Sequence, residues 1–184
     1  LVDRLKSTIP NIKADELIRL NKLAQTVVFT SKGTPFIYAG EEVMRDKKGV
    51  HNSYKSPDNI NAIDWNRKVQ NNDAYQYYKA LIQLRKNHPA FRMADADLVR
   101  KHLEFLPVEQ ENVIAFQLKD HANGDLWENI VVILNANPAA IKLMIPQGKY
   151  TVVCNNGRID ERGMGSVYGQ EVYVPAQSAL ILYK

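Results

Sequence analysis

The sequence predicts a chain of two parts, an α/β part followed by an antiparallel all-β part. Up to residue 89, apolar residues recur at helical spacing in two long segments, with a short, wholly apolar run between them. Beyond residue 89, short apolar runs alternate with turn residues, which is typical of an antiparallel β-sandwich. We therefore expect residues 1–92 and residues 98–184 to form separate domains.

The N-terminal part contains two expected helices and one expected strand. An apolar stripe at helical spacing in residues 14–30 predicts an amphipathic helix that packs through this stripe. The run at residues 35–39 is apolar throughout and lies between glycines, which predicts a buried parallel strand. After residues 71–72, which can cap a helix, the spacing of residues 75–85 predicts a second helix that ends near residues 87–89. The stripe of the first helix consists of Leu17, Leu20, Ala24, Val27 and Val28.

The C-terminal part is expected to hold only strands and turns. Turns are predicted at residues 123–124, 146–148 and 156–157, which are rich in glycine and asparagine. The single cysteine, Cys154, excludes an internal disulfide and is expected to be a buried strand residue. The predicted strands are residues 103–105, 113–118, 130–134, 141–145, 150–154, 171–174 and 179–183.

Composition excludes several functional classes. The net charge of +4 is spread along the chain without a dense basic cluster, so we expect no nucleic-acid binding. No apolar run approaches the ~20 residues that cross a bilayer, so no membrane segment is expected. The four histidines lack metal-ligand spacing, and we assign neither a metal site nor a cofactor. The chain begins at Leu1 without a signal-peptide pattern, and we expect it to be a fragment of a longer protein.

Several segments resemble one enzyme family. Residues 33–42, GTPFIYAGEE, resemble the last barrel strand of the α-amylase superfamily. Residues 51–65, HNSYKSPDNINAIDW, look like the loop that follows this strand in type I pullulanases. Residues 81–90, LIQLRKNHPA, are similar to the closing helix of these enzymes, and residues 174–180, VPAQSAL, to the end of their C-terminal sheet. The resemblance covers nearly the whole chain.

The resemblance implies a (β/α)8 barrel followed by an antiparallel β-sandwich. Of this architecture the chain would hold helix 7, strand 8 and helix 8 of the barrel, then the β-domain, and the rest of the barrel would be its partner. The family hydrolyses α-1,6 glucosidic bonds in pullulan and in starch- or glycogen-derived glucans with retention, using paired carboxyl groups. Those acids follow other strands and map to no residue here. We therefore assign no catalytic residue and expect the fragment alone to be inactive.

The loop at residues 41–65 is the expected substrate contact, because barrel active sites lie at the carboxyl ends of the strands. Asp58 and Asn61 are candidate binding residues, since a carboxylate and an amide match the paired hydroxyls of a glucose unit. Tyr54 is a third candidate, which could stack on a sugar face. The structural alternatives are a turn at Asp58 and a loop anchor at Tyr54. We expect Trp65 to be packed where the loop returns to the barrel.

Two other functional interpretations remain open. The parent enzyme could act on α-1,4 bonds, or the chain could be an independent sugar-binding or structural β-domain. The expected ligand is an α-glucan. A barrel strand without its neighbours exposes unpaired backbone, which predicts self-association of the fragment.

Overall fold

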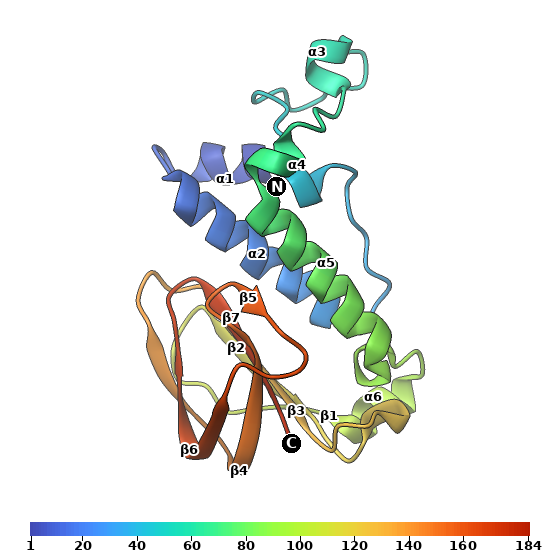
Figure 1. Ribbon diagram of the computed structural model, residues 1–184, viewed down its shortest axis with the longest axis vertical. Helices are drawn as coiled ribbons and strands as arrows, with labels where there is room; N and C mark the ends of the chain where they lie inside the picture. The colour runs from blue at the N-terminus through green and yellow to red at the C-terminus, as the bar shows by residue number, and fades with distance from the viewer.

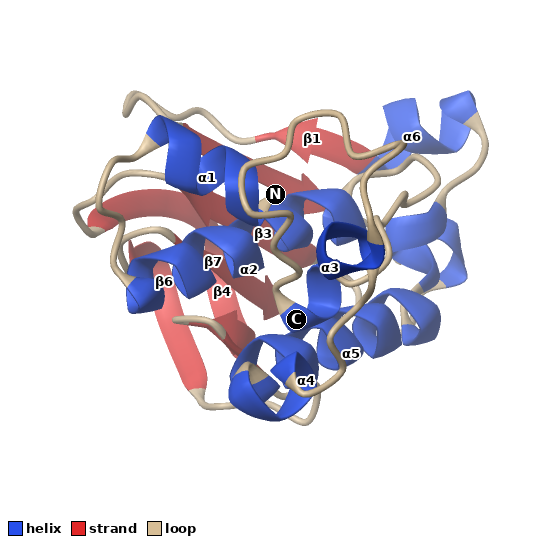
Figure 2. Cartoon of the chain, turned by 90° about the horizontal axis from the view of Figure 1, so that it is seen from above, coloured by secondary structure: helices blue, strands red, loops and turns tan.

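The computed structural model describes residues 1–184 and places a layer of helices on one face of an antiparallel sheet (Figures 1 and 2). Two long helices, α2 (Ala14–Thr30) and α5 (Asn72–Asn87), lie side by side and confirm the two predicted helices. The short helices are α1 (Val2–Thr8), α3 (Asp58–Asn61), α4 (Arg67–Gln70) and α6 (Ala96–His102), and the 3-10 turns are η1 (Glu41–Val43), η2 (Pro89–Arg92) and η3 (Ala122–Gly124). None of these helices has the length and apolar character needed to cross a bilayer.

Local sequence determines how the helical layer connects to the sheet. Helix α5 ends at Asn87 because proline at position 89 disfavours a helical conformation at the residue before it. The side chain of Asp95 then caps α6, accepting hydrogen bonds from the backbone amides of Asp97 at 2.7 Å and Leu98 at 3.2 Å. Helix α6 was not among the predicted elements, and it leads directly into the first strand.

The sheet has seven strands in the order β1-β2-β3-β7-β4-β5, with β6 paired to β4, and every pairing is antiparallel. It is one continuous sheet that folds over on itself, so that β4 and β6 face β2, β3 and β7 across a buried apolar layer. The strands are β1 (Leu103–Phe105), β2 (Val113–Leu118), β3 (Ile130–Asn135), β4 (Ile141–Asn155), β5 (Arg158–Ile159), β6 (Ser166–Val174) and β7 (Ser178–Tyr183).

Strand β4 corrects one prediction and confirms another. The turn expected at residues 146–148 is a bulge inside the strand, where the register with β6 shifts between Met144 and Gly148. A proline has no amide to donate, and a bulge is one of the few places where a sheet accepts it. At the other end, Asn156 and Gly157 have positive φ angles of 48° and 69° and form the predicted two-residue turn into β5.

The sheet carries an apolar core on each face. One core lies between the helices and the sheet and joins residues of α2 and α5 to residues of β2, β3, β4 and β7. Cys154 is fully buried in this core, as predicted. The second core fills the fold of the sheet, with Val131, Ile133 and Leu182 fully buried at its centre.

The buried face of α2 differs from the predicted apolar stripe. No member of that stripe is fully buried, and Val27 is 39% exposed. The buried face instead combines the apolar residues Leu23 and Phe29 with polar residues, some of which pair across the helical layer. Thr26 Oγ1 lies 2.7 Å from the Tyr77 hydroxyl, and the Tyr78 hydroxyl donates to Asn21 Oδ1 at 2.8 Å. Burial of these polar groups is tolerated because each of these hydroxyls has a partner.

The predicted buried strand at residues 35–39 is also wrong for this chain. The segment pairs with no strand, and Phe36 is 84% exposed. Extended backbone becomes a strand only when a neighbour accepts and donates its hydrogen bonds, and no strand of the chain pairs with this segment.

Candidate functional site

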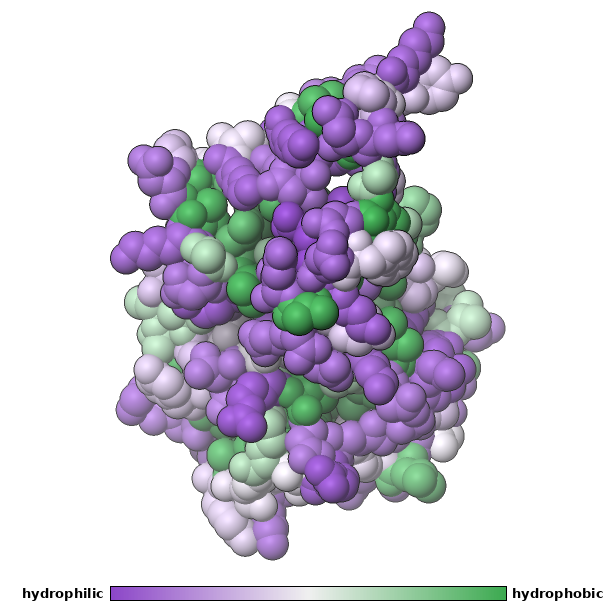
Figure 3. All heavy atoms as spheres, turned by 45° about the horizontal axis from the view of Figure 1, so that its top comes forward, coloured by the Kyte–Doolittle hydropathy of each residue, from purple (hydrophilic) through white to green (hydrophobic).

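The candidate site is the loop between η1 and α4, which stands away from the body of the molecule and carries α3 at its tip (Figure 1). The surface of this projecting tip is mainly hydrophilic (Figure 3). The loop is not structureless, as the sequence suggested, because it contains the single-turn helix α3 and ends in α4.

Polar contacts with α1 fix the base of the loop. The carboxylate of Asp3 accepts hydrogen bonds from the backbone amides of Lys47 at 3.0 Å and Gly49 at 2.9 Å. Beside it, Lys6 Nζ donates to Asp46 at 2.5 Å. Partial burial would raise the pKa of Asp46, but the hydrogen bonds from Lys6 and from a neighbouring amide outweigh burial and lower that pKa to about 2. Asp46 is therefore ionised at neutral pH and holds the loop to α1.

The cationic side chains of Arg45 and Lys47 connect this base to the tip of the loop. The Arg45 guanidinium and the Lys47 ammonium lie over the Tyr38 ring, 5.3 Å and 5.8 Å from its centroid. Arg45 also donates to the carbonyl oxygens of Ala39, at 3.1 Å, and Asn61. This packing requires Gly40, whose φ angle is +93° and whose Cα lies against the Arg45 side chain.

Asn61 braces the tip from inside. Its amide nitrogen donates to the carbonyl oxygens of Ser53 and Ser56, both at 2.8 Å. Its amide oxygen accepts from Lys47 Nζ at 2.5 Å, and the same ammonium contacts Ser53 Oγ at 2.9 Å. Asn61 is one of the predicted binding residues, but its contact with Lys47 was not predicted, because nothing in the spacing of an irregular loop shows that its two ends meet.

The other two candidates present free side chains. Tyr54 is 86% exposed and Asp58 is exposed at the start of α3, and neither side chain makes a hydrogen bond within the chain. Asp58 and Asn61 thus stand at the two ends of one helical turn, the first open to solvent and the second committed to the loop. Trp65 is 62% exposed, so the prediction that it is packed is wrong for this chain.

The neighbouring acids Glu41 and Glu42 lie in η1, not in an extension of a strand. Glu41 is buried, and Glu42 Oε2 accepts a hydrogen bond from the amide of Gly40 at 3.1 Å. The Glu42 carboxylate therefore stabilises the turn at the start of the loop.

Comparisons with known proteins agree with one another. Residues 99–158 match the family described as "Pullulanase, all-beta domain". The pullulanase of Bacillus subtilis (strain 168) is 35% identical over 160 residues, which are 86% of this chain and 22% of that protein. The solved pullulanase from Bacillus acidopullulyticus is 42% identical with a TM-score of 0.96, covering 100% of this chain and 22% of that one.

A third match is a ligand complex. The pullulanase from Paenibacillus barengoltzii, solved with maltohexaose and α-cyclodextrin, is 37% identical with a TM-score of 0.86 over 99% of this chain and 27% of that one. The chain thus spans about a quarter of the length of these relatives. In both sequence and fold, the chain resembles a C-terminal part of the type I pullulanases.

Proposed function

We propose that the chain is the C-terminal part of a retaining debranching hydrolase that cleaves α-1,6 glucosidic bonds in pullulan and related glucans. The observation that carries this proposal is the match to a solved pullulanase at 42% identity and a TM-score of 0.96 over the entire chain. Identity at this level over a whole segment supports a shared activity, whereas a shared fold alone would not.

We further propose that α2, residues 35–39 and α5 are helix 7, strand 8 and helix 8 of a (β/α)8 barrel, and that residues 1–92 and 98–184 are separate structural units of the parent. Two features support this assignment. The segment at residues 35–39 is extended and unpaired, with Phe36 and Tyr38 exposed, as expected of a strand whose neighbours belong to the rest of a barrel. The apolar stripe of α2 is also incompletely buried, since Val27 is exposed and the other four members are half-buried.

In this proposal the projecting loop is one rim of the glucan cleft, with Tyr54, Asp58 and Asn61 toward the sugar. The free Asp58 carboxylate would accept hydrogen bonds from glucose hydroxyls, and the exposed Tyr54 ring would stack on a sugar face. Asn61 would act mainly by holding the loop, because its amide nitrogen already donates to Ser53 and Ser56.

The chain alone is proposed to be inactive, because retention needs two carboxyl groups about 5 to 5.5 Å apart that flank the bond. The purified chain should release no reducing ends from pullulan. Release above the level of a boiled control would contradict this part of the proposal.

A chimera tests the activity itself. In the Bacillus acidopullulyticus enzyme, the segment that aligns with this chain is replaced by residues 1–184, and pullulan and amylose are compared as substrates. We expect hydrolysis of pullulan in preference to amylose. A folded chimera that cleaves only amylose would favour an α-1,4-acting parent, and one that cleaves neither would contradict the proposal.

Substitutions in the chimera test the rim. Asp58→Ala should lower kcat/KM on pullulan about tenfold, the cost of one hydrogen bond to a charged group. Asp97→Ala is the matched control, because Asp97 is an exposed aspartate on α6, away from the loop. Equal activities of the two variants would remove Asp58 from the site.

A further inference from the structure

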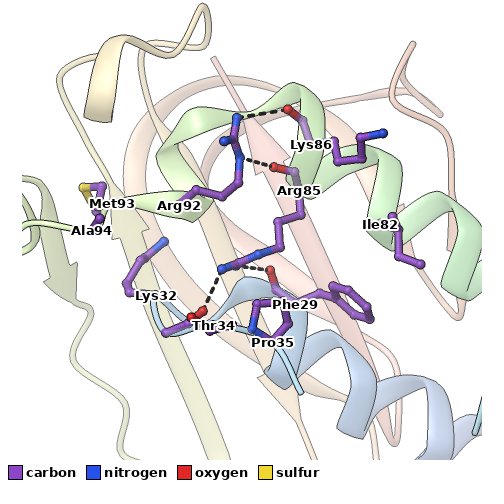
Figure 4. Close-up of a pocket in the computed structure, with 11 residues that line it drawn as sticks. Phe29, Lys32, Thr34, Pro35, Ile82, Arg85, Lys86, Arg92, Met93 and Ala94 are labelled. Carbon is purple, nitrogen blue, oxygen red and sulfur yellow. Dashed lines mark hydrogen bonds between the residues drawn. The ribbon is translucent and has the colours of Figure 1, made fainter. Parts of the chain in front are cut away.

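An open cavity of 570 Å³ lies where the C-terminal ends of α2 and α5 meet η2 (Figure 4). Small-molecule sites have volumes of roughly 300 to 1,000 Å³ and combine apolar walls with a few convergent polar groups. Here the apolar walls include Ile82 and Met93, and no aspartate or glutamate lines the cavity. The charged lining residues are all cationic: Lys32, Arg85, Lys86 and Arg92.

These four cations have no anionic partner, since none of them forms an ion pair in the chain. The two guanidinium groups bind the carbonyl oxygens of helix ends instead. Arg85 donates to Phe29 at 2.8 Å, Ser31 at 2.7 Å and Gly33 at 2.8 Å, which caps the end of α2.

Arg92 caps α5 in the same way, donating to the carbonyl oxygens of Arg85 at 2.9 Å and Lys86 at 3.1 Å. Each helix C-terminus supplies only about −0.5 of a charge. The two ends together therefore offset about one of the positive charges, and the cavity keeps an excess of positive charge.

Lys32 shows the effect of this excess. Its ammonium donates to the carbonyl oxygen of Ala90 at 3.1 Å and lies over the rings of Phe91 and Phe116. Burial, and then the charge of Arg85, lower the pKa of Lys32 to about 7. The other charged side chains that line the cavity come from α5 and η2, and all are cationic. Only an anion from outside the chain would therefore favour the protonated form of Lys32.

We propose that this cavity binds a phosphate-bearing small molecule with an apolar body. Lys32 and Arg92 have donors left after their backbone contacts, and these would hold the phosphate. The apolar body would rest against Ile82 and Met93. The site is separate from the glucan rim proposed above, and its ligand class differs, because an α-glucan carries no charge.

Isothermal titration of the chain with phenyl phosphate and with sulfate tests the proposal, with sodium chloride balancing the ionic strength. Phenyl phosphate should bind more tightly than sulfate, and phenol should not bind. Sulfate binding should raise the pKa of Lys32, so that Lys32 takes up a proton at pH 7.5. Titrations in buffers of different ionisation enthalpy measure this uptake. Sulfate itself does not titrate near neutral pH and cannot contribute to it. Lys32→Met should weaken both anions about tenfold and abolish the uptake.

Lys79→Met is the matched control, because Lys79 is exposed on α5 and does not line the cavity. It should leave binding and proton uptake unchanged. Arg92→Gln supplies a second variant that keeps Lys32 and should weaken the anions by a similar factor. The absence of saturable binding, or equal affinities of the wild type and Lys32→Met with circular dichroism showing both folded, would overturn the proposal.

Discussion

His88 Nδ1 lies 2.9 Å from a carboxylate oxygen of Asp125, and both side chains are buried where the end of α5 meets the loop before β3. Because a carboxylate only accepts, Nδ1 carries the proton. Asp125 also accepts from the amides of Ala90 at 3.1 Å and Trp127 at 3.0 Å, and the His88 ring stacks on Trp127. This group of contacts fastens the helical layer to the sheet.

Asp125→Asn should lower the free energy of unfolding at pH 7 by about 2–4 kcal/mol, because it weakens a buried, charged hydrogen-bond acceptor. Burial would raise the pKa of Asp125, but the hydrogen bonds from His88 and the two amides hold it below its ordinary value. A carboxyl whose pKa is lowered by folding stabilises the fold at pH values above its pKa in the unfolded chain, about 3.9. This contribution is lost as the pH falls through the pKa of the folded state.

Urea denaturation at pH 7 and near pH 3 checks this prediction. The difference between Asp125→Asn and the wild type should shrink at the lower pH. The control Asp97→Asn changes an exposed acid whose partner, Arg100, is also exposed, and it should stay within about 0.5 kcal/mol. Parallel pH profiles of the wild type and Asp125→Asn would contradict the assignment.

Gly40→Ala should destabilise the start of the projecting loop by about 1–3 kcal/mol. The φ angle of Gly40 is +93°, and a Cβ there would lie 2.8 Å from Cδ and 2.9 Å from Cβ of Arg45. Gly49→Ala separates the strain of a positive φ from the steric clash, since Gly49 has a φ of +77° but open space around it. Gly33→Ala should cause neither strain nor a clash. We expect the losses of stability to follow that order in thermal denaturation. Equal losses at all three glycines would exclude the Arg45 contact as a cause.

Asn61→Asp should loosen the tip of the loop without unfolding the chain. The substitution keeps the acceptor for Lys47 but removes the donors to the carbonyl oxygens of Ser53 and Ser56. Hydrogen exchange should accelerate at the amides of Ser56 and Ile60, which bond within the loop, while the midpoint of thermal unfolding stays nearly unchanged. Unaltered exchange at both amides would show that Asn61 does not brace the tip.

The chain should self-associate through the unpaired segment at residues 35–39. Phe36 is 84% exposed and Tyr38 is 48% exposed next to backbone that pairs with no strand. Size-exclusion chromatography with light scattering should show a mass that rises with concentration, and Phe36→Ser should reduce it. Phe105→Ser is the control, since Phe105 is 68% exposed on β1. A monodisperse monomer at every concentration would contradict the prediction.

Cys154 should resist alkylation in the folded chain. Burial raises the pKa of its thiol to about 12, so the reactive thiolate is scarce at pH 8. Its Sγ lies 3.4 Å from the Tyr77 hydroxyl, inside the core that α5 shares with the sheet. The rate of labelling by iodoacetamide should follow global unfolding in urea. Fast labelling in native buffer would show that this core opens locally.

Local sequence patterns predicted the helices and strands of this fold more accurately than they predicted which residues are buried. The helix at residues 14–30 is correct, yet its apolar stripe is only partly buried, and the most buried face contains hydrogen-bonded polar residues such as Thr26, which contacts Tyr77. The periodicity of apolar residues can predict which apolar side chains are buried. It cannot predict which buried polar side chains form hydrogen bonds with one another. Likewise the break at residues 146–148 looks like a turn in sequence, and only pairing with β6 makes it a bulge.

The sequence predicted where the loop lies but not the contacts within it, and the binding role of the loop stays a prediction. The resemblance pointed to the loop that holds Tyr54 and Asp58, and both side chains are free. The contact between Lys47 and Asn61 could not be predicted, since it joins residues of an irregular segment across a distance that no repeat fixes. Trp65 is 62% exposed and Phe36 is 84% exposed, so the burial that the sequence predicted for both is not found.

The core shared by the helices and the sheet bears on how such enzymes can be recombined. Tyr77 and Cys154 come from opposite sides of the boundary near residue 95 and touch at its centre, and Lys22 on α2 donates to the carbonyl oxygen of Gly157 at the β4–β5 turn. An exchange of residues 98–184 alone between two homologues would replace one member of each such pair and leave the other. A crossover point upstream of α2 transfers both sides of this shared core together. Grafting experiments on related proteins should therefore use that position.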